Sequence, residues 1–180
     1  MPQDSTSSMR PENGRAEASA TILTFLTAWQ MVFKKGQVKP GQTVLIHAAG
    51  SGVSSLAIKL CKMVGARVIA TTGSPEKRER ALAIGADEVI VSSAQDFVAE
   101  VKRLTGKLGA DVILDHVGGE IFEKSIAAAA WGGKIDVTHA AGRTRIVVRT
   151  DVYAAFINDQ ESLAGYQSGQ TYLVGVRHAF

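Results

Sequence analysis

The sequence has only one cysteine, Cys61, and four histidines: His47, His116, His139 and His178. One thiol cannot form an intramolecular disulfide or a cysteine cluster, and these five residues are not at spacings that build a zinc site. We therefore expect no metal centre. Cys61 falls among apolar residues at helical spacing, which predicts a buried structural thiol.

Long apolar runs and runs of one charge are also missing. No stretch reaches the roughly 18 consecutive apolar residues that span a bilayer, and the first twenty residues are too polar for a secretory signal. The net charge of +3 comes from scattered cations, with no run longer than Lys34-Lys35. We therefore expect a soluble, cytoplasmic protein without a membrane or nucleic-acid partner.

Composition divides the chain into three parts. Residues 1–15 are polar with little to bury, and predict a disordered lead. Residues 16–142 carry regular apolar patterns, enough for one well-cored domain. Residues 143–180 form an extension of uncertain fold that could complete a sheet. In it we expect strands at 146–148 and 172–176 and a helix at 152–163.

Strand and helix patterns alternate along the middle part. Val44–Ile46 is a continuous run of β-branched and aliphatic residues, typical of a strand buried on both faces. The expected strands are 43–46, 67–72, 88–91, 111–114 and 134–137, the last after a Gly132-Gly133 turn; the expected helices are 22–35, 53–64, 74–84, 95–104 and 121–130. Such alternation requires right-handed crossovers. The sequence therefore predicts one α/β domain with a doubly wound, Rossmann-type parallel sheet.

Small residues fill the junction between the first strand and its helix, from Ala48 to Ser55. They allow a ligand to approach the backbone closely, and the free N–H groups of the next helix favour a phosphate. The residues expected to contact a pyrophosphate are Gly50, Ser51, Gly52 and Val53. Because Ser55 stands at the third glycine of G-x-G-x-x-G, a tight turn without a ligand is the competing interpretation.

The end of the second strand carries no acidic residue. Dinucleotide sites usually have an Asp or Glu there, about 20 residues after the glycine turn, to bind the adenosine ribose. Here Thr72, Gly73 and Ser74 occupy that place, and the cations Lys77, Arg78 and Arg80 follow. An uncharged strand end followed by cations suits a 2′-phosphate, so NADPH is favoured over NADH. The assigned contacts are Thr72, Gly73, Ser74 and Lys77. Lys77, Arg78 and Arg80 could equally form the solvated face of a helix.

The segment Asp115-His116-Val117-Gly118-Gly119 follows the fourth strand, on the ligand side of an open sheet. Val117 is assigned as a further cofactor contact. His116 could be a ligand or a proton donor, but a lone loop histidine is more often solvated or locally hydrogen-bonded. No catalytic residue is assigned.

Several motifs occur in an order that resembles a known family. They are Thr27-Ala28-Trp29, Val38 to His47, Ala48 to Ser55, Gly65 to Thr71, Gly73 to Lys77, Leu82 to Asp87 and Gly109 to Asp115. Together they resemble the cofactor domain of medium-chain dehydrogenases/reductases, and are most similar to the zinc-independent, zeta-crystallin-like quinone oxidoreductases. In that branch glycine usually stands where this chain has Ser51 and Ser54. The resemblance implies NADPH-dependent hydride transfer to a quinone, enone or related carbonyl compound.

Length is the largest departure from that family. Its members carry a GroES-like catalytic domain before the cofactor domain, and no such domain is recognisable here. The chain therefore resembles the cofactor domain of a longer reductase, and a non-enzymatic nucleotide-binding or interaction module is the alternative. The resemblance also implies a homodimer. The apolar residues Ile22, Leu23, Phe25, Leu26 and Trp29 predict an interface, unless residues 153–180 cover them.

Overall fold

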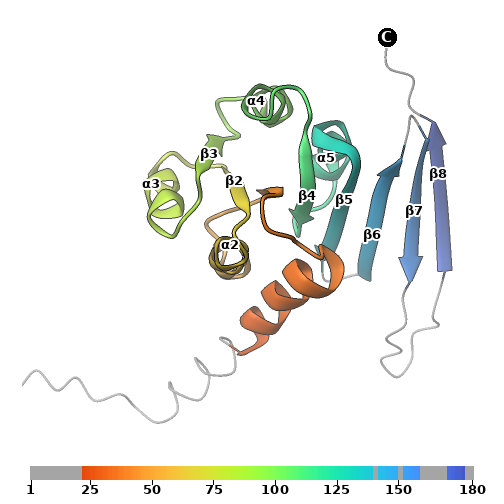
Figure 1. Ribbon diagram of the computed structural model, residues 1–180, viewed down its shortest axis with the longest axis horizontal. Coiled ribbons are helices and arrows are strands. Elements are labelled where there is room, and N and C mark those ends of the chain that lie inside the picture. The colour runs from red at the N-terminus through yellow and green to blue at the C-terminus, as the bar shows by residue number, and fades with distance from the viewer. Residues whose placement is uncertain (1–21, 140–141, 150–151, 159–169, 177–180) are drawn as a thin grey trace, which may run out of the picture.

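The computed structural model describes residues 22–139, 142–149, 152–158 and 170–176 (Figure 1). The expected lead at 1–15 lies outside these ranges. Within them the chain forms one sheet in the order β3-β2-β1-β4-β5-β6-β7-β8. Helices pack on both faces of its first half (Figure 1).

Five parallel strands form that half of the sheet. They are β1 (Thr43–Ile46), β2 (Arg67–Thr72), β3 (Glu88–Val91), β4 (Ala110–Asp115) and β5 (Ala129–His139). In register, Val44 pairs with Val68 of β2 on one side and with Val112 of β4 on the other. The order β3-β2-β1-β4-β5 confirms the predicted Rossmann-type sheet. The direction of winding reverses between β1 and β4, which is where such sheets bind ligands.

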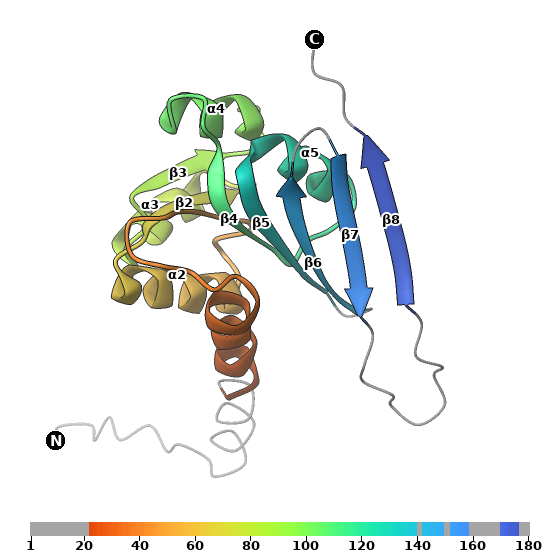
Figure 2. The ribbon, with the colours of Figure 1, turned by 45° about the vertical axis from the view of Figure 1, so that its right-hand side comes forward.

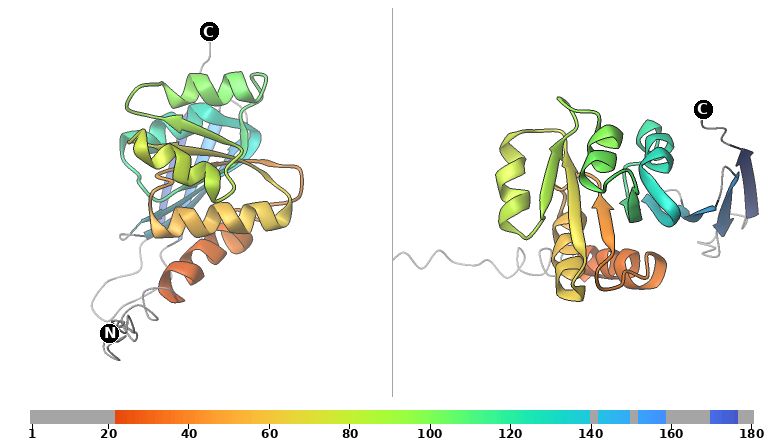
Figure 3. Two further views of the ribbon diagram at one scale, coloured as in Figure 1. Left: turned by 90° about the vertical axis from the view of Figure 1, so that its left-hand side faces the viewer. Right: turned by 45° about the horizontal axis from the view of Figure 1, so that its top comes forward.

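The helices lie on opposite faces of the sheet. Residues 22–29 form an α-helix that continues as η1 (Gln30–Lys35), and the others are α2 (Gly52–Val64), α3 (Glu76–Ala83), α4 (Phe97–Leu104) and α5 (Glu120–Ala128). In the left view of Figure 3 the first helix and α2 lie below the sheet and α4 lies above it. The fold is therefore doubly wound, as predicted.

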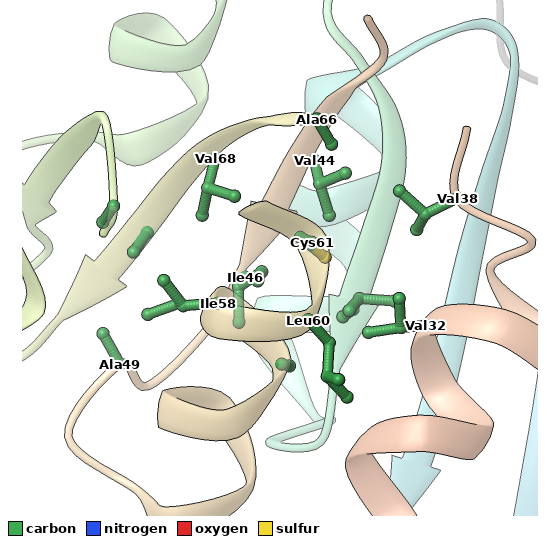
Figure 4. Packing of buried hydrophobic residues seen from close by; sticks show 14 of the residues in the cluster. Val32, Val38, Val44, Ile46, Ala49, Ile58, Leu60, Cys61, Ala66 and Val68 are labelled. Atoms are coloured by element: carbon green, nitrogen blue, oxygen red, sulfur yellow. The ribbon is translucent and has the colours of Figure 1, made fainter. Parts of the chain in front are cut away.

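Successive residues of β1 belong to two different cores. Val44 and Ile46 pack with the first helix, α2 and α3, whereas Leu45 packs with α4 and α5. All three side chains are buried, which explains their continuous apolar run. Cys61 of α2 lies in the first core, as Figure 4 shows, and burial raises the pKa of its thiol to about 12. The prediction of a buried structural thiol is confirmed.

The first helix changes type before it ends. The sequence predicts one α-helix over 22–35, but η1 has π-helical hydrogen bonds, and the Gly36 N–H donates to the Met31 carbonyl over 2.8 Å. A Cβ at Gly36 would lie 2.7 Å from that same oxygen, so only glycine permits this closure. Met31 and Val32 are fully buried, and η1 thereby holds the helix against the first core.

Strand β5 is longer than predicted and includes the residues expected to form a turn. The predicted helix over 121–130 ends two residues too late, because α5 ends at Ala128 and Ala129 already belongs to β5. Gly132 and Gly133 lie inside the strand, where the register with β4 shifts between Ala110 and Val112. A Cβ at Gly109 would lie 2.6 Å from the Ala129 backbone, so this close approach requires glycine.

Antiparallel strands extend the sheet beyond β5. They are β6 (Gly142–Arg149), β7 (Val152–Asn158) and β8 (Gln170–Val176), and Figure 2 shows them side by side. The strands predicted at 146–148 and 172–176 are confirmed. The helix predicted at 152–163 is wrong for residues 152–158, which pair with both neighbours in the sheet. That segment is rich in β-branched and aromatic residues, which favour a strand once partners exist on both sides.

Candidate functional site

The candidate site lies where the carboxyl ends of β1, β2 and β4 meet. Parallel strands bring the segments that follow Ile46, Thr72 and Asp115 to one edge of the sheet. Because the strand order reverses between β1 and β4, the segments that follow these two strands run apart at this edge. Crevices at such points are the usual dinucleotide sites of open α/β sheets.

The turn from β1 into α2 is built by backbone contacts. Ala48 adopts a positive φ of 49°, and the Ala49 N–H donates to the Thr71 carbonyl of β2 over 2.8 Å. Ser51 is the N-cap of α2. The first-turn N–H groups, those of Gly52 and Val53, have no acceptor within the helix itself. The turn therefore offers donors and the positive end of the α2 dipole to an anion.

Lys77 of α3 lies over this turn. A Cβ placed on Gly50 would be 2.7 Å from Lys77 Cδ and 3.5 Å from its Nζ. The side chain thus packs into the space that glycine leaves, and carries its ammonium group to the edge of the turn. Two residues that the sequence assigned to different phosphates, Gly50 and Lys77, are therefore neighbours.

The end of β2 folds into a small polar turn. The Ser74 N–H donates to Thr72 Oγ1, and Thr72 Oγ1 donates back to the Ser74 carbonyl, both over 3.3 Å. The Ser74 hydroxyl donates to the Glu76 carboxylate. This hydrogen bond is the main cause that lowers the pKa of the Glu76 carboxyl group. Pro75 is the N-cap of α3 and provides no side-chain cap, so the helix that was predicted to open at residue 74 begins at Glu76.

Three side chains converge between the turn and β4. Ser51 Oγ lies 3.2 Å and Ser54 Oγ 3.4 Å from His116 Nε2. Ser51 Oγ also donates to Ser54 Oγ, and the Ser54 hydroxyl donates to the His47 carbonyl over 2.7 Å. His116 is thus tied to the two serines that replace the glycines expected in this turn.

Beneath the turn lies a buried histidine. His47 Nδ1 is 3.1 Å from Thr71 Oγ1 and Nε2 is 2.9 Å from Ser125 Oγ, so β1 is joined to β2 and α5. Burial lowers the pKa of His47 to about 4, against an opposing effect of Asp115 and with a smaller contribution from His116. His47 is therefore a neutral structural group at pH 7.

Asp115 organises the segment that follows β4. One carboxylate oxygen, Oδ1, accepts the N–H groups of Val117 and Gly118, each over 2.9 Å. The other, Oδ2, is buried without a hydrogen-bond partner among the described residues, as is Nδ1 of His116. Val117 is 45% exposed beside them, where a ligand has access to it.

The predicted contacts thus gather at one edge of the sheet, together with two residues whose contacts the sequence did not predict, Glu76 and His116. Gly50, Ser51, Gly52, Val53 and Lys77 lie at the turn; Thr72, Gly73 and Ser74 lie at the end of β2; Val117 lies beyond β4. The sequence reasoning gave Glu76 no role at the site, although its position two residues after Ser74 was the available signal. His116 was recognised as a loop histidine, but nothing local in the sequence links it to serines more than sixty residues earlier.

Fold and site together define a nucleotide-binding Rossmann domain. The zinc-binding dehydrogenase family matches residues 52–170, more than half of the chain. The chain therefore belongs to this family, within the medium-chain dehydrogenase/reductase superfamily, whose members use a nicotinamide cofactor. In the part of the chain that the structure describes, no group of three or more His, Cys, Asp and Glu residues could hold a metal ion. The described residues therefore do not provide the ligands for the zinc ion that the family is named after.

Curated relatives include parts of large synthases. The chain is 38% identical over 118 residues to a phenolphthiocerol/phthiocerol polyketide synthase of Mycobacterium tuberculosis. It is 41% identical over 127 residues to the highly reducing polyketide synthase apmlA of Arthrinium phaeospermum. These matches cover 66% and 68% of this chain but only 5% of each synthase.

Solved structures agree with this assignment. An NAD-dependent alcohol dehydrogenase is 57% identical, with a TM-score of 0.61 over 63% of this chain and 33% of that one. A quinone oxidoreductase of Pseudomonas syringae is 33% identical, with a TM-score of 0.62 over 75% and 40%. A polyketide synthase domain described as an enoyl reductase is 37% identical, with a TM-score of 0.61 over 66% and 68%. The chain is thus an oxidoreductase-family cofactor domain.

No helix in the described ranges is both long enough and apolar enough to cross a membrane.

Proposed function

We propose that this chain is the NADPH-binding part of a reductase that transfers hydride to a quinone, an enone or a related carbonyl compound. The observation that carries the proposal is the packing of Lys77 against Gly50, which brings a cation to the edge of the phosphate turn. The names of the relatives support the substrate class, since they include a quinone oxidoreductase and an enoyl reductase domain.

The residues of this chain bind and orient the dinucleotide. The N–H groups of Gly52 and Val53 and the dipole of α2 hold the diphosphate, and Gly50 allows its close approach. Lys77 and Ser74 bind the 2′-phosphate, with Thr72 and Gly73 shaping that turn. Val117 contacts the cofactor beyond β4. When bound, the reduced nicotinamide supplies the hydride that the acceptor receives.

NADH is the second candidate, and Glu76 favours it. The Ser74 hydroxyl donates to the Glu76 carboxylate, which places a negative group where a 2′-phosphate would bind. A carboxylate in that region suits ribose hydroxyls instead. One relative of 57% identity is named as an NAD-dependent alcohol dehydrogenase, which agrees with this alternative.

Calorimetric titration of the 180-residue chain with NADPH and with NADH tests the proposal. We expect both to bind and NADPH to bind more tightly, because a charge-assisted contact to the 2′-phosphate is made by NADPH alone. Equal affinities would remove the NADPH assignment. Failure of both to bind would remove the dinucleotide function altogether.

A non-enzymatic nucleotide-binding or interaction module is the alternative function, because the chain spans only 33% of the alcohol dehydrogenase chain and 40% of the quinone oxidoreductase chain described above. An NADPH oxidation assay with a simple quinone or enone, run on this chain and on any longer gene product, separates the two. We expect turnover only when a catalytic domain is present to shape the acceptor site. A longer product that binds NADPH without oxidising it would favour the module.

A further inference from the structure

The hydrogen bonds around His116 favour one of its two neutral tautomers. The Ser54 hydroxyl hydrogen is directed to the His47 carbonyl, and the Ser51 hydroxyl hydrogen to Ser54 Oγ. Neither hydroxyl therefore has a hydrogen to donate to His116 Nε2, which lies within 3.4 Å of both oxygens. In this arrangement of hydrogen bonds Nε2 is the donor, so a neutral His116 carries its proton there and leaves Nδ1 as a bare acceptor.

That bare acceptor is left without a partner. Nδ1 of His116 is buried with no hydrogen bond among the described residues, and so is Oδ2 of the adjacent Asp115, a residue that is fully buried. An unpartnered buried polar group costs stability, so two side by side call for a functional explanation. A second proton on Nδ1 would give His116 a positive charge next to the Asp115 carboxylate and beside the phosphate turn.

We propose that His116 is a positioning residue for the diphosphate and that it takes up a proton when the dinucleotide binds. This inference rests on the proposed function. Ser51, the N-cap at the turn, is hydrogen-bonded to His116, so negative charge that arrives at the turn lies close to the imidazole. A doubly protonated ring stabilises that charge and still donates from Nε2 to the serines.

The charges around His116 determine the direction of the effect. Asp115 on β4 favours the charged ring, the buried His47 that follows β1 is neutral, Ser51 and Ser54 present their hydroxyl groups, and Lys77 lies across the turn on Gly50. In the free protein burial lowers the pKa of His116, with Asp115 acting against this. A bound diphosphate raises it. Affinity is therefore highest below the free-protein pKa, and it falls as pH rises until the pKa of the complex is passed.

Calorimetry with NADH tests this most cleanly, because the 2′-phosphate of NADPH also titrates, near pH 6, and NADH lacks it. Titrations of the full chain at pH 6, 7 and 8, each in two buffers of different ionisation enthalpy, count the protons taken up. We expect uptake approaching one proton within the window and an affinity that weakens by up to about tenfold per pH unit there. In His116→Gln we expect no such uptake and a flat affinity over the same range.

A second measurement covers the case in which His116→Gln does not fold. Histidine ring NMR signals of the wild-type chain, titrated with and without NADH, should show the pKa of His116 rising on binding. Dinucleotide binding without proton uptake, uptake that persists in His116→Gln, or an unmoved His116 titration would each overturn the inference and leave the proposed function standing. If neither NADH nor NADPH binds, the inference and the proposed function fall together.

Discussion

At the scale of single residues, the contact between Gly50 and Lys77 is the most informative. Gly50→Ala would place a Cβ 2.7 Å from Lys77 Cδ, but the atom it meets belongs to a flexible side chain. Lys77 can swing away at little cost to folding. We therefore expect an unchanged unfolding midpoint in urea, together with weaker NADPH binding.

Lys77→Ala should weaken NADPH binding about tenfold or more and leave NADH nearly unchanged, because only NADPH has the extra phosphate. Arg78→Ala, on the next residue of α3, is the matched control and should change little. In the double variant with Gly50→Ala, the loss should be smaller than the sum of the two single losses, since both changes disturb the contact between Gly50 and Lys77. Additive losses in calorimetry would show that Lys77 does not act through this turn.

Glu76→Gln tests the other charge near the 2′-phosphate. Removing the carboxylate that accepts from Ser74 should strengthen NADPH binding about two- to fivefold, the effect expected of an exposed charge, and leave NADH unchanged. Competition titrations with both cofactors measure it. Weaker NADH binding with unchanged NADPH binding would instead assign Glu76 to the ribose and favour the NADH alternative.

At the scale of helices and strands, His47 couples stability to pH. Its pKa is lowered to about 4 in the folded chain, below the unfolded value of 6.5, because burial disfavours the charged ring. Between pH 4 and pH 6.5 the unfolded chain therefore binds a proton at His47 that the folded chain does not bind. The lowered pKa of His47 therefore adds about 3 kcal/mol to the free energy of unfolding above pH 6.5. This contribution is lost as the pH falls toward 4.

Urea unfolding at pH 7 and pH 4.5 measures this loss, which should be about 2–3 kcal/mol between the two. His47→Asn removes the titrating ring. It should be less stable at pH 7, since Thr71 and Ser125 lose a partner, but its stability should fall less on acidification. An equal drop in the wild type and in His47→Asn would assign the acid sensitivity to other groups.

The same elements show what the sequence could predict. The five parallel strands and the helices between them were predictable from local patterns. A strand buried on both faces has a continuous apolar run, such as Val44–Ile46. The strand β7 was not, since its residues became a strand only through pairing with β6 and β8. The π-helical turn of η1 and the link from Ser51 to His116 also depend on contacts that local patterns do not contain.

At the scale of the whole molecule, an apolar patch lies exposed on the first helix. Ile22, Leu23, Phe25, Leu26 and Trp29 are each at least 36% exposed. Trp29 packs on Phe33 at 5.7 Å between ring centroids, and Lys34 Nζ lies 5.9 Å from the Trp29 ring. The strands β7 and β8 belong to the far end of the sheet, so these parts of the C-terminal region leave the patch exposed (Figure 1). Exposed apolar surface of this kind usually marks an interface.

We predict that the chain self-associates through this patch. Light scattering over a tenfold dilution should show a mass that falls toward the monomer as concentration drops, and Trp29→Glu should give a monomer throughout, because a carboxylate cannot be buried there unpaired. Met63→Glu is the matched control: Met63 is 82% exposed on α2, outside the patch, and its replacement should leave association unchanged. A wild-type monomer at every concentration, with aggregation only in a chain ending near Gly142, would show instead that residues beyond Gly142 protect the patch.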